Sequence, residues 1–493
     1  MKHSNRLPVV ALIVICISLA SAQSNSSRGG ASRKTYPAGP ITSWKQIPIP
    51  LLHPFNPQQP RRIELANGLV IFLQEDHELP KIDGVIRIRG GGRDVPADKL
   101  GMGAIYGRAW RTGGTKSKTG DDLDDFLETR AARVETAVGI DSTFLSWSSL
   151  KGDFDQVWPV VVDLLQNPEF RQGKIDLAKR QIISAISRRN DEVFDIAQRE
   201  ANKLSYGVNN PYARTPEYST VAAVTRDDLV NWHKRTVSAT NMILGVTGDF
   251  DSSEMERRLR DAFANWPRGE RFEPVKTEFH DPVPGIYFVE KDDVNQSVII
   301  MVDLGFERRN PDYYALEVMN ELFGGGFSSR LFVNIRTKLG LAYFVGGGVG
   351  SEFDHPGVTS ISMSTKSSTT AAAIDALKKQ INDLVQGSIK EAEVKKAKDG
   401  ILNSFIFEFD SKEKVQEARM GYEFYGYPAD FLEQFRAGVE KVTVADVERV
   451  AKKYVHPEKL AVLVVGNSKE FDRPLSSFGK VTPIDITIPG SPK

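Results

Sequence analysis

An internal repeat constrains this sequence more than any other feature. The segment VTRDDLVNWHKRTVSATNMILGVTGDF, which starts at Val224, is similar to VTVADVERVAKKYVHPEKLAVLVVGNS, which starts at Val442. The two align without a gap at an offset of 218 residues, so that Thr225 pairs with Thr443. Similarity at so long a period indicates duplicated domains rather than a solenoid of short repeats.

Each copy of the repeat predicts the same local structure. Thr225 and Thr443 are each followed three residues later by an aspartate, a variant of the capping box that begins helices. An amphipathic helix follows, and then an apolar run that ends at Gly248 or Gly466, as a buried strand would.

The start of the second copy mixes strand and helix signals. Residues 286–290 and 297–306 are predicted strands, and a helix is expected to begin with Asn310 as its N-cap and Pro311 at its first position. With antiparallel hairpin signals in both copies, the sequence predicts an α+β fold of two homologous domains, each with an antiparallel sheet packed against helices.

The first 22 residues are predicted to be a signal peptide. A basic start precedes an apolar run over residues 7–20, and Ala20-Ser21-Ala22 supplies small residues for cleavage after Ala22. The alternative is an uncleaved anchor, although the run is short for a bilayer span. We therefore expect an exported protein, periplasmic or secreted, with no stable membrane span after cleavage.

Composition excludes several classes of protein. The only cysteine, Cys16, lies in the predicted signal, which excludes thiol catalysis and cysteine-ligated zinc in the mature chain. The 64 basic residues balance 64 acidic ones, so there is no general electrostatic case for binding nucleic acid. A chain that is 40% hydrophobic and 26% charged is neither disordered nor a polytopic membrane protein.

The predicted organisation has six parts. They are a signal peptide (1–22), an extended leader (23–60), a first domain (61–266), a Pro-rich linker (267–285), a second domain (286–480) and a C-terminal tail (481–493).

The order of several motifs resembles the insulinase/pitrilysin superfamily of zinc metallopeptidases, in its shorter form related to mitochondrial processing peptidase. The motifs are LANGLVIFLQEDHELP (65–80), RIRGGGRDVPADKLGMGA (87–104), GGTKSKTGDDLDDFLE (113–128), NNPYARTPEY (209–218), VTGDFD (246–251) and GGGFSSRLFVNIRTKLGLAYFVGGG (324–348). The resemblance covers about residues 60–470, and it implies two homologous α+β domains that face each other across a cleft.

The zinc motif that the resemblance implies is absent. The family's H-x-x-E-H would fall on Ala104, Gly107 and Arg108 when aligned on Gly101, or on Ile105, Arg108 and Ala109 when aligned on Gly114-Thr115. Neither alignment contains a zinc ligand. A later glutamate of the family would fall near residues 184–186, where the sequence is Ser-Ala-Ile.

The histidines elsewhere do not replace the motif. No two of them lie within a helical turn, and His233, in a charged helix segment, is predicted to lie at the surface. A metal site assembled from distant histidines stays open as an alternative. We expect no metal or cofactor in this chain, and zinc in a partner subunit.

The other half of the family's active site is present. The resemblance implies that Arg336 and Tyr343, seven residues apart in IRTKLGLAY, hold the substrate backbone and help to stabilise the oxyanion. A guanidinium and a phenol are suitable donors for that role. Arg330 is a rival for the arginine, but a structural role near the Gly324–Gly326 turn fits it better.

Three hypotheses for the function follow. The first is a non-zinc subunit that offers Arg336 and Tyr343 to an unfolded peptide, which a zinc-bearing partner would hydrolyse. The second is a catalytically inactive peptide-binding or scaffold subunit. The third is an active peptidase with an unconventional metal site.

Overall fold

The computed structural model of this chain describes Ser43, residues 57–387 and residues 389–490. The predicted signal peptide, nearly all of the predicted leader and the last three residues lie outside the described residues. All the elements that follow belong to one unit, Asn56–Lys493.

The first half of this unit is built on a six-stranded sheet in the order β1-β2-β6-β3-β5-β4. Strand β6 runs parallel to β2, and the other neighbours are antiparallel. The strands are β1 (Arg61–Glu64), β2 (Val70–Glu75), β3 (Lys81–Arg89), β4 (Arg133–Val138), β5 (Ser142–Leu150) and β6 (Met242–Gly248). The helices are α1 (Met102–Thr112), α2 (Gly120–Glu128), α3 (Phe154–Gln166), α4 (Gln172–Ser187), α5 (Val193–Tyr206), α6 (Tyr218–Ala222), α7 (Arg226–Thr236) and α8 (Ser252–Phe263).

The second half has its own six-stranded sheet, in the order β10-β12-β8-β13-β7-β14. Strand β7 is parallel to β13 and to β14, and the other pairs are antiparallel. The strands are β7 (Gly285–Glu290), β8 (Gln296–Leu304), β10 (Phe344–Gly348), β12 (Val358–Lys366), β13 (Ala461–Gly466) and β14 (Val481–Pro483), and β9 (Phe306–Glu307) pairs with β11 (Ser351–Glu352). The helices are α9 (Tyr313–Asn320), α10 (Thr370–Val385), α11 (Glu391–Glu408), α12 (Lys412–Tyr425), α13 (Phe431–Lys441) and α14 (Val444–Tyr454).

The two sheets repeat one topology, and the predicted α+β fold is confirmed. Strands β2, β6, β3, β5 and β4 occupy the places that β7, β13, β8, β12 and β10 occupy in the second sheet. The sheets differ at one edge, where β1 is antiparallel to β2 but β14 is parallel to β7.

The capping boxes that the repeat predicts are both present. Asp228 Oδ2 accepts from Thr225 N at 2.8 Å, and Thr225 Oγ1 accepts from Asp228 N at 3.3 Å, at the start of α7. Thr443 and Asp446 exchange the same two bonds, at 3.0 and 3.2 Å, at the start of α14. The helix N-termini are therefore set by local sequence in both copies.

The predicted N-cap at Asn310 is wrong by two residues. Helix α9 begins at Tyr313 and its N-cap is Asp312. Asn310 Oδ1 instead accepts a hydrogen bond from Asp312 N at 2.9 Å, which makes an Asx turn before the helix.

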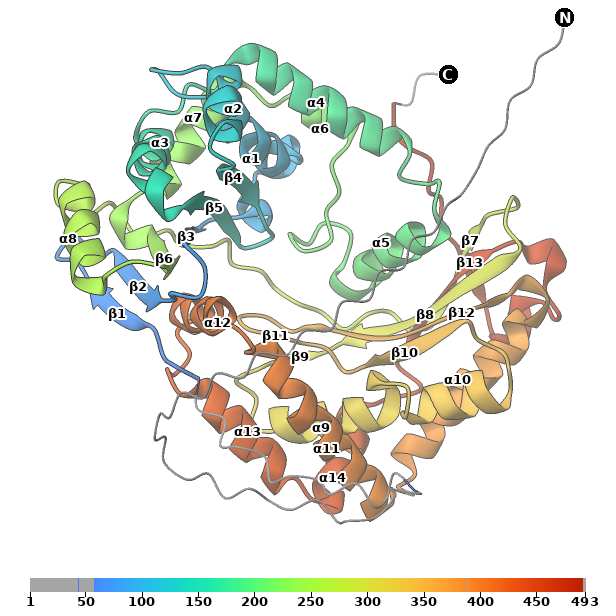
Figure 1. The fold of residues 1–493 in the computed structure, drawn as a ribbon. Helices are drawn as coiled ribbons and strands as arrows, with labels where there is room; N and C mark the ends of the chain where they lie inside the picture. The colour runs from blue at the N-terminus through green and yellow to red at the C-terminus, as the bar shows by residue number, and fades with distance from the viewer. Residues whose placement is uncertain (1–42, 44–56, 388, 491–493) are drawn as a thin grey trace, which may run out of the picture. The chain divides into compact units, whose positions relative to one another are not determined.

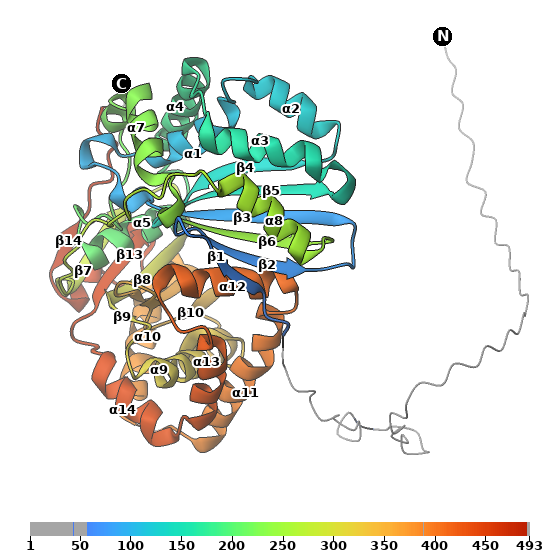
Figure 2. The same cartoon turned by 90° about the vertical axis from the view of Figure 1, so that its left-hand side faces the viewer.

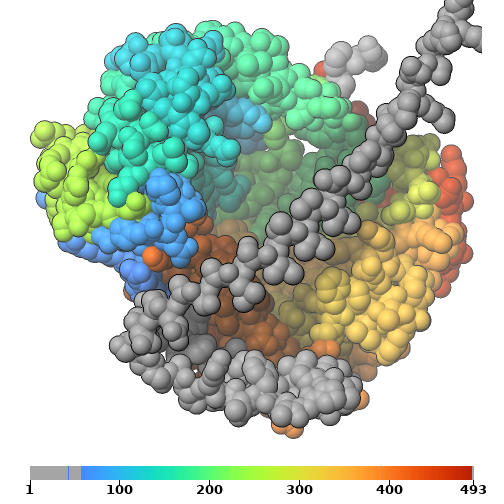
Figure 3. Space-filling model, viewed as in Figure 1, coloured from blue at the N-terminus to red at the C-terminus, as the bar shows by residue number. Residues whose placement is uncertain are grey.

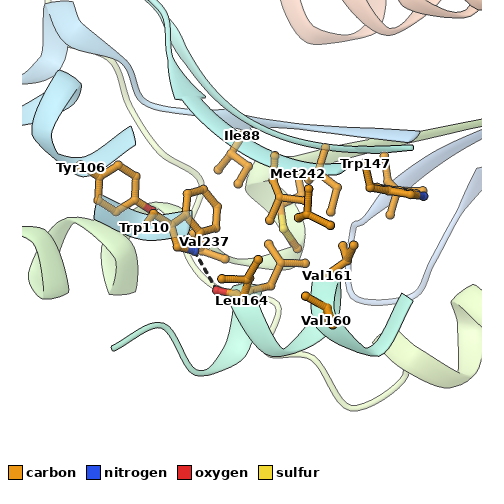
Figure 4. Packing of buried hydrophobic residues seen from close by; sticks show 14 of the residues in the cluster. Ile88, Tyr106, Trp110, Trp147, Val160, Val161, Leu164, Val237 and Met242 are labelled. Atoms are coloured by element: carbon orange, nitrogen blue, oxygen red, sulfur yellow. Dashed lines mark hydrogen bonds between the residues drawn. The ribbon is translucent and has the colours of Figure 1, made fainter. Parts of the chain in front are cut away.

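Helices α1 and α3 pack over one face of the first sheet. Trp110 and Tyr106 of α1 are fully buried, and Trp110 Nε1 donates to Leu164 O of α3 at 2.8 Å. Figure 4 shows this bond among the apolar side chains of the core, with Ile88 and Met242 contributed by the sheet.

Each half supplies a helix to the other half's sheet. Helix α5 of the first half packs on β8 and β13, and α12 of the second half packs on β6 and β2. Figure 1 shows α5 beside β8 and β13, and Figure 2 shows the first sheet between α3 on one side and α12 on the other. The two halves are therefore interlocked, and a hollow remains between parts of them on the face shown in Figure 3.

Polar contacts fix the position of α12 on the first sheet. Gln416 Nε2 donates to Phe72 O at 3.1 Å and to Val246 O at 2.9 Å, and Gln416 Oε1 accepts from Thr247 Oγ1 at 2.8 Å. Met420 and Phe424 complete the contact by packing against apolar side chains of the first sheet (Val70, Phe72 and Ile243).

The close approach of α12 requires a glycine at position 245. A Cβ on Gly245 would lie 2.4 Å from Met420 Sδ and 2.7 Å from Gln416 Oε1, and those side chains belong to residues only 3% and 2% exposed. We expect Gly245→Ala to lower the free energy of unfolding by about 2 kcal/mol, measured by urea denaturation. The matched control is Gly173→Ala in α4, where a Cβ meets nothing within 4 Å. Equal urea midpoints for the two variants would contradict this close packing of α12 against Gly245.

The predicted linker and tail both contact the first half. Residues 267–284 form no helix or strand, but Phe272 is buried and Phe272 N donates to Asn241 Oδ1 at 2.7 Å. The predicted tail begins with β14, and Ile486 O accepts from Asn190 Nδ2 at 2.7 Å. The domain boundaries drawn from the sequence stay predictions.

Candidate functional site

Two π-helices joined by a glycine-rich turn carry the arginine of the predicted pair. They are η6 (Glu321–Gly325) and η7 (Phe332–Lys338). A Cβ on Gly324 would lie 2.2 Å from Gly347 O, so this position must be glycine for η6 to approach β10. π-Helical turns are rare and occur frequently at functional sites.

Arg336 and Tyr343, the two residues of the predicted pair, lie near each other. Arg336 Cζ is 5.8 Å from the centroid of the Tyr343 ring and 4.8 Å from that of Phe332. The Phe332 ring meets Phe327 edge-on, with centroids 5.0 Å apart. We call Phe327, Phe332 and Tyr343 the aromatic row. Phe332 and Phe327 were not predicted from the sequence, although Phe332 lies one helical turn before Arg336.

The donors of the pair are available to a ligand. Tyr343 is 80% exposed, and neither its hydroxyl nor the Arg336 guanidinium has a hydrogen bond or ion pair with any residue that the structure describes. The surrounding sequence has no Asp or Glu between Glu321 and Glu352. The Arg336 guanidinium is therefore a positive charge without a carboxylate partner among the described residues, beside the neutral Tyr343 donor.

Arg330 differs from Arg336 in its partners. Its Nε and one terminal nitrogen each lie 2.8 Å from a carboxylate oxygen of Glu393 in α11. This bidentate pair ties the glycine-rich turn to α11.

Strand β10 is an edge strand whose outer side is partly covered. Asn320 exchanges two hydrogen bonds with the backbone of Val349, both at 2.9 Å, and η6 packs along Gly346–Gly348. An extended peptide cannot pair with this covered part of the strand. The uncovered end of the strand begins at Phe344, next to Tyr343.

A pocket of about 710 Å³ lies near that end, on the side of α5. The Phe344 ring meets the Phe194 ring of α5 with centroids 6.4 Å apart. Several carboxylates line the pocket beside Phe194 (Asp191, Glu192, Asp292, Asp293 and Glu470).

The positions of the zinc motif lie on α1 and do not fit zinc. Ala104 and Arg108 are exposed one turn apart, and Gly107 is buried against β4, where a Cβ would lie 3.1 Å from Val138 N. The hydroxyl of Thr136 donates to Gly107 O at 2.5 Å, which ties the helix to β4. A methyl group, a hydrogen and a permanently protonated guanidinium offer no ligand.

The alternative alignment of the zinc motif, and the place of the family's later glutamate, also offer no zinc ligand. Ile105 and Ala109 are buried apolar residues of α1, and Ser184 and Ala185 are exposed on α4. Among the described residues, no three His, Cys, Asp or Glu side chains are grouped so that they could hold a metal ion.

The prediction that His233 lies at the surface is wrong. The residue is 8% exposed, its Nδ1 lies 2.8 Å from the Tyr106 hydroxyl, and its Nε2 lies 2.8 Å from Leu165 O. Burial lowers the pKa of His233 to about 4, so the ring is neutral near pH 7. With Nε2 as donor to the carbonyl, Nδ1 accepts from Tyr106, which is a structural role beneath α1.

Comparison with known proteins identifies the family. Residues 223–401 match the family model described as the peptidase M16 inactive domain. These residues therefore belong to an M16 domain, and the resemblance of the sequence to the insulinase/pitrilysin superfamily is confirmed. The zinc motif of the superfamily is absent from the sequence.

Curated relatives of this protein span most of its length. The Non-peptidase homolog YmxG of Helicobacter pylori is 23% identical, covering 83% of this chain and 94% of the relative. An Uncharacterized zinc protease of Rickettsia bellii is 24% identical, covering 82% and 97%. The Probable inactive metalloprotease YmfF of Bacillus subtilis is 24% identical, covering 59% and 67%.

Solved structures share the fold of this protein. The peptidase M16 inactive domain from Pseudomonas fluorescens aligns with a TM-score of 0.75 at 21% identity, covering 85% of this chain and all of the other. A protease from Helicobacter pylori aligns with a TM-score of 0.73 at 17% identity, covering 83% and 100%. In the described part of the chain, no helix has the length and apolar character needed to cross a membrane.

Proposed function

We propose that this chain is the non-zinc subunit of an exported, heterodimeric M16 metalloendopeptidase. A partner subunit with H-x-x-E-H would bind the zinc ion and hydrolyse an extended, unfolded peptide. This chain would contribute Arg336 and Tyr343, which would donate to the scissile carbonyl and stabilise its developing oxyanion.

One observation carries the proposal. The Arg336 guanidinium and the Tyr343 hydroxyl lie side by side without a partner among the described residues, whereas α1 offers no zinc ligand at Ala104, Gly107 or Arg108. Arg336 is partly exposed, contacts two aromatic rings and makes no ion pair with a described residue, so its donors are left for a ligand.

Partner-dependent hydrolysis tests the proposal. The purified chain, mixed with an M16 subunit that carries H-x-x-E-H from the same genome, is expected to raise cleavage of an unfolded peptide above that of the partner alone. Arg336→Ala should lower kcat/KM of the mixture about tenfold or more, because a charge-assisted hydrogen bond is lost. Tyr343→Phe should have a smaller effect because it removes one neutral donor.

Lys338→Ala is the control for this experiment. Lys338 is an exposed cation two residues from Arg336, and its Nζ donates to Asn334 Oδ1 at 3.0 Å. The control should cleave like the unmodified mixture. If the mixture is no faster than the partner alone, or if the two variants leave kcat/KM unchanged, the proposal fails.

A second function is a catalytically inactive peptide-binding or scaffold subunit. Two relatives favour it by their names, a non-peptidase homolog from H. pylori and a probable inactive metalloprotease from B. subtilis. Size-exclusion chromatography with light scattering separates the two functions. A stable monomer or homodimer that binds unfolded peptide but does not join a zinc-bearing subunit supports the scaffold.

Export rests on the basic start, the apolar run and Ala20-Ser21-Ala22. Sequencing of the N-terminus of the protein purified from its native cells should begin at Gln23. A mature protein that begins at Met1 would contradict cleavage.

A further inference from the structure

We infer that Arg336, Tyr343 and Phe327 form a subsite for the C-terminal carboxylate of a peptide whose last residue is aromatic or large and apolar. The inference rests on the proposed function for its setting, since such a carboxylate is what hydrolysis leaves at the carbonyl that the pair would contact. The binding itself needs neither a partner subunit nor turnover.

The charge of the site suits an anion better than a neutral carbonyl. Arg336 has no carboxylate partner among the described residues, and the chain from 322 to 351 contains no acidic residue. Arg330, the nearest other arginine in the sequence, is already paired with Glu393. A guanidinium binds a carboxylate through two parallel hydrogen bonds, which are about twice as strong as those to neutral acceptors.

The aromatic row prepares Arg336 for such a contact. Its Cζ lies 4.8 Å from the Phe332 centroid and 5.8 Å from the Tyr343 centroid. Both contacts are between the guanidinium and an aromatic ring, and neither occupies an N–H group in a hydrogen bond to a described residue. The rings therefore restrict the side chain while its donors stay accessible, and the Tyr343 hydroxyl adds a further donor.

The side chain of the terminal residue also has a surface to contact. Phe327 is 81% exposed, although its ring meets Phe332 edge-on at 5.0 Å. An aromatic ring so exposed, next to the Phe332 ring on which Arg336 packs, can bury a second ring or a large apolar side chain.

The covered edge of β10 makes the site selective for a chain end. The Asn320 side chain hydrogen-bonds with both the backbone N–H and the carbonyl of Val349, and η6 covers Gly346–Gly348. A long peptide strand therefore cannot be added there. Recognition therefore depends on the terminal group and its side chain rather than on a ladder of backbone bonds.

The same geometry connects binding to hydrolysis. Water adds across the scissile amide bond, the C–N bond breaks, and the products are a carboxylate and a protonated amine. The carboxylate carbon is the former carbonyl carbon, so the N-terminal product would keep its contact with Arg336 and gain a charge. We expect this product to leave more slowly than a neutral analogue.

Peptide binding to this chain alone tests the inference. The probe is a fluorescein-labelled peptide that ends in Phe, made as the free acid and as the C-terminal amide, and its anisotropy is followed at low ionic strength. The acid is expected to bind about tenfold more tightly than the amide. Arg336→Gln, which keeps a donor but loses the charge, should remove this preference, and Lys338→Gln should keep it.

A second peptide pair tests the aromatic contact. Free acids that end in Phe and in Gly should differ in affinity, and Phe327→Ala should reduce the difference. Equal affinity of acid and amide, an acid preference that survives in Arg336→Gln, or no binding of the acid up to about 1 mM overturns the inference. If the mixture cleaves peptide faster than the partner alone but this chain does not prefer the free acid, the inference fails and the proposed function stands. If this chain prefers the free acid but the mixture cleaves no faster, the proposed function fails and the subsite stands.

Discussion

Residues 57–276 and 277–490, produced as separate fragments, are expected to lack native tertiary structure. Helix α5 belongs to the first fragment, but Ile196, Ala197 and Ala201 are buried on the second sheet. Helix α12 belongs to the second fragment, but Met420 and Phe424 are buried on the first sheet. Each fragment would therefore expose both an apolar sheet face and an apolar helix face.

The loss is large compared with the stability of a domain. Burial of one large apolar side chain contributes about 1.5–3 kcal/mol, and a domain is stable by only about 5–15 kcal/mol. The second sheet alone would uncover several such side chains (Val289, Val298, Ile300, Val302, Leu463 and Val465). Near-UV circular dichroism and binding of a hydrophobic dye to each fragment measure the effect.

A protein that is cut after folding distinguishes the effect of losing the exchanged helix from the effect of breaking the chain. A protease site inserted after Lys276, an exposed position, can be cut after folding. The nicked protein should keep its native near-UV spectrum, because both exchanged helices remain in place. A native spectrum from either fragment alone would show that the exchange is not needed for folding.

Acid is expected to destabilise the protein through His233. Burial lowers its pKa to about 4, and in an unfolded chain the pKa of a histidine is about 6.5. Between these values the unfolded state binds more protons, so the free energy of unfolding is full above about pH 6.5 and falls as the pH approaches 4. The contribution that is lost is about 3 kcal/mol.

Urea denaturation at several pH values between 4 and 7 measures this effect. His233→Gln, which has no proton to gain, should show a shallower loss of stability with falling pH than the unmodified protein. His280→Gln is the control, because the His280 side chain is 82% exposed. If the difference between the unmodified protein and His233→Gln is the same at pH 4.5 and pH 7, the buried neutral ring is not a source of acid sensitivity.

Local features of the fold could be predicted with good accuracy. The capping boxes at Thr225 and Thr443 depend on one side chain and an aspartate three residues later, so their spacing in the chain is sufficient. Asn310 shows the limit of such signals, because it satisfies a backbone group before the helix instead of capping it.

The candidate site could be predicted only through the resemblance. The spacing of Arg336 and Tyr343 is common by itself, and it gains meaning from the surrounding family pattern. Phe327 was not predicted, because its contact with Phe332 depends on how the turn after Gly326 folds back. The surface position predicted for His233 was wrong because the charged neighbours on α7 face away from the Tyr106 contact.

The duplication, the α+β class and the absence of zinc ligands at residues 104, 107 and 108 were determined by the sequence alone, because each depends only on which residues stand at which spacing. The exchange of α5 and α12, the burial of His233 and the aromatic row around Arg336 were decided by the tertiary structure. Gln416 reaches Phe72 across 344 residues, and His233 reaches Tyr106 across 127. Contacts between segments so distant leave no periodic pattern in the sequence of either segment. Glutamine and histidine also occur on solvated helix faces, so neither residue type by itself predicts such a contact.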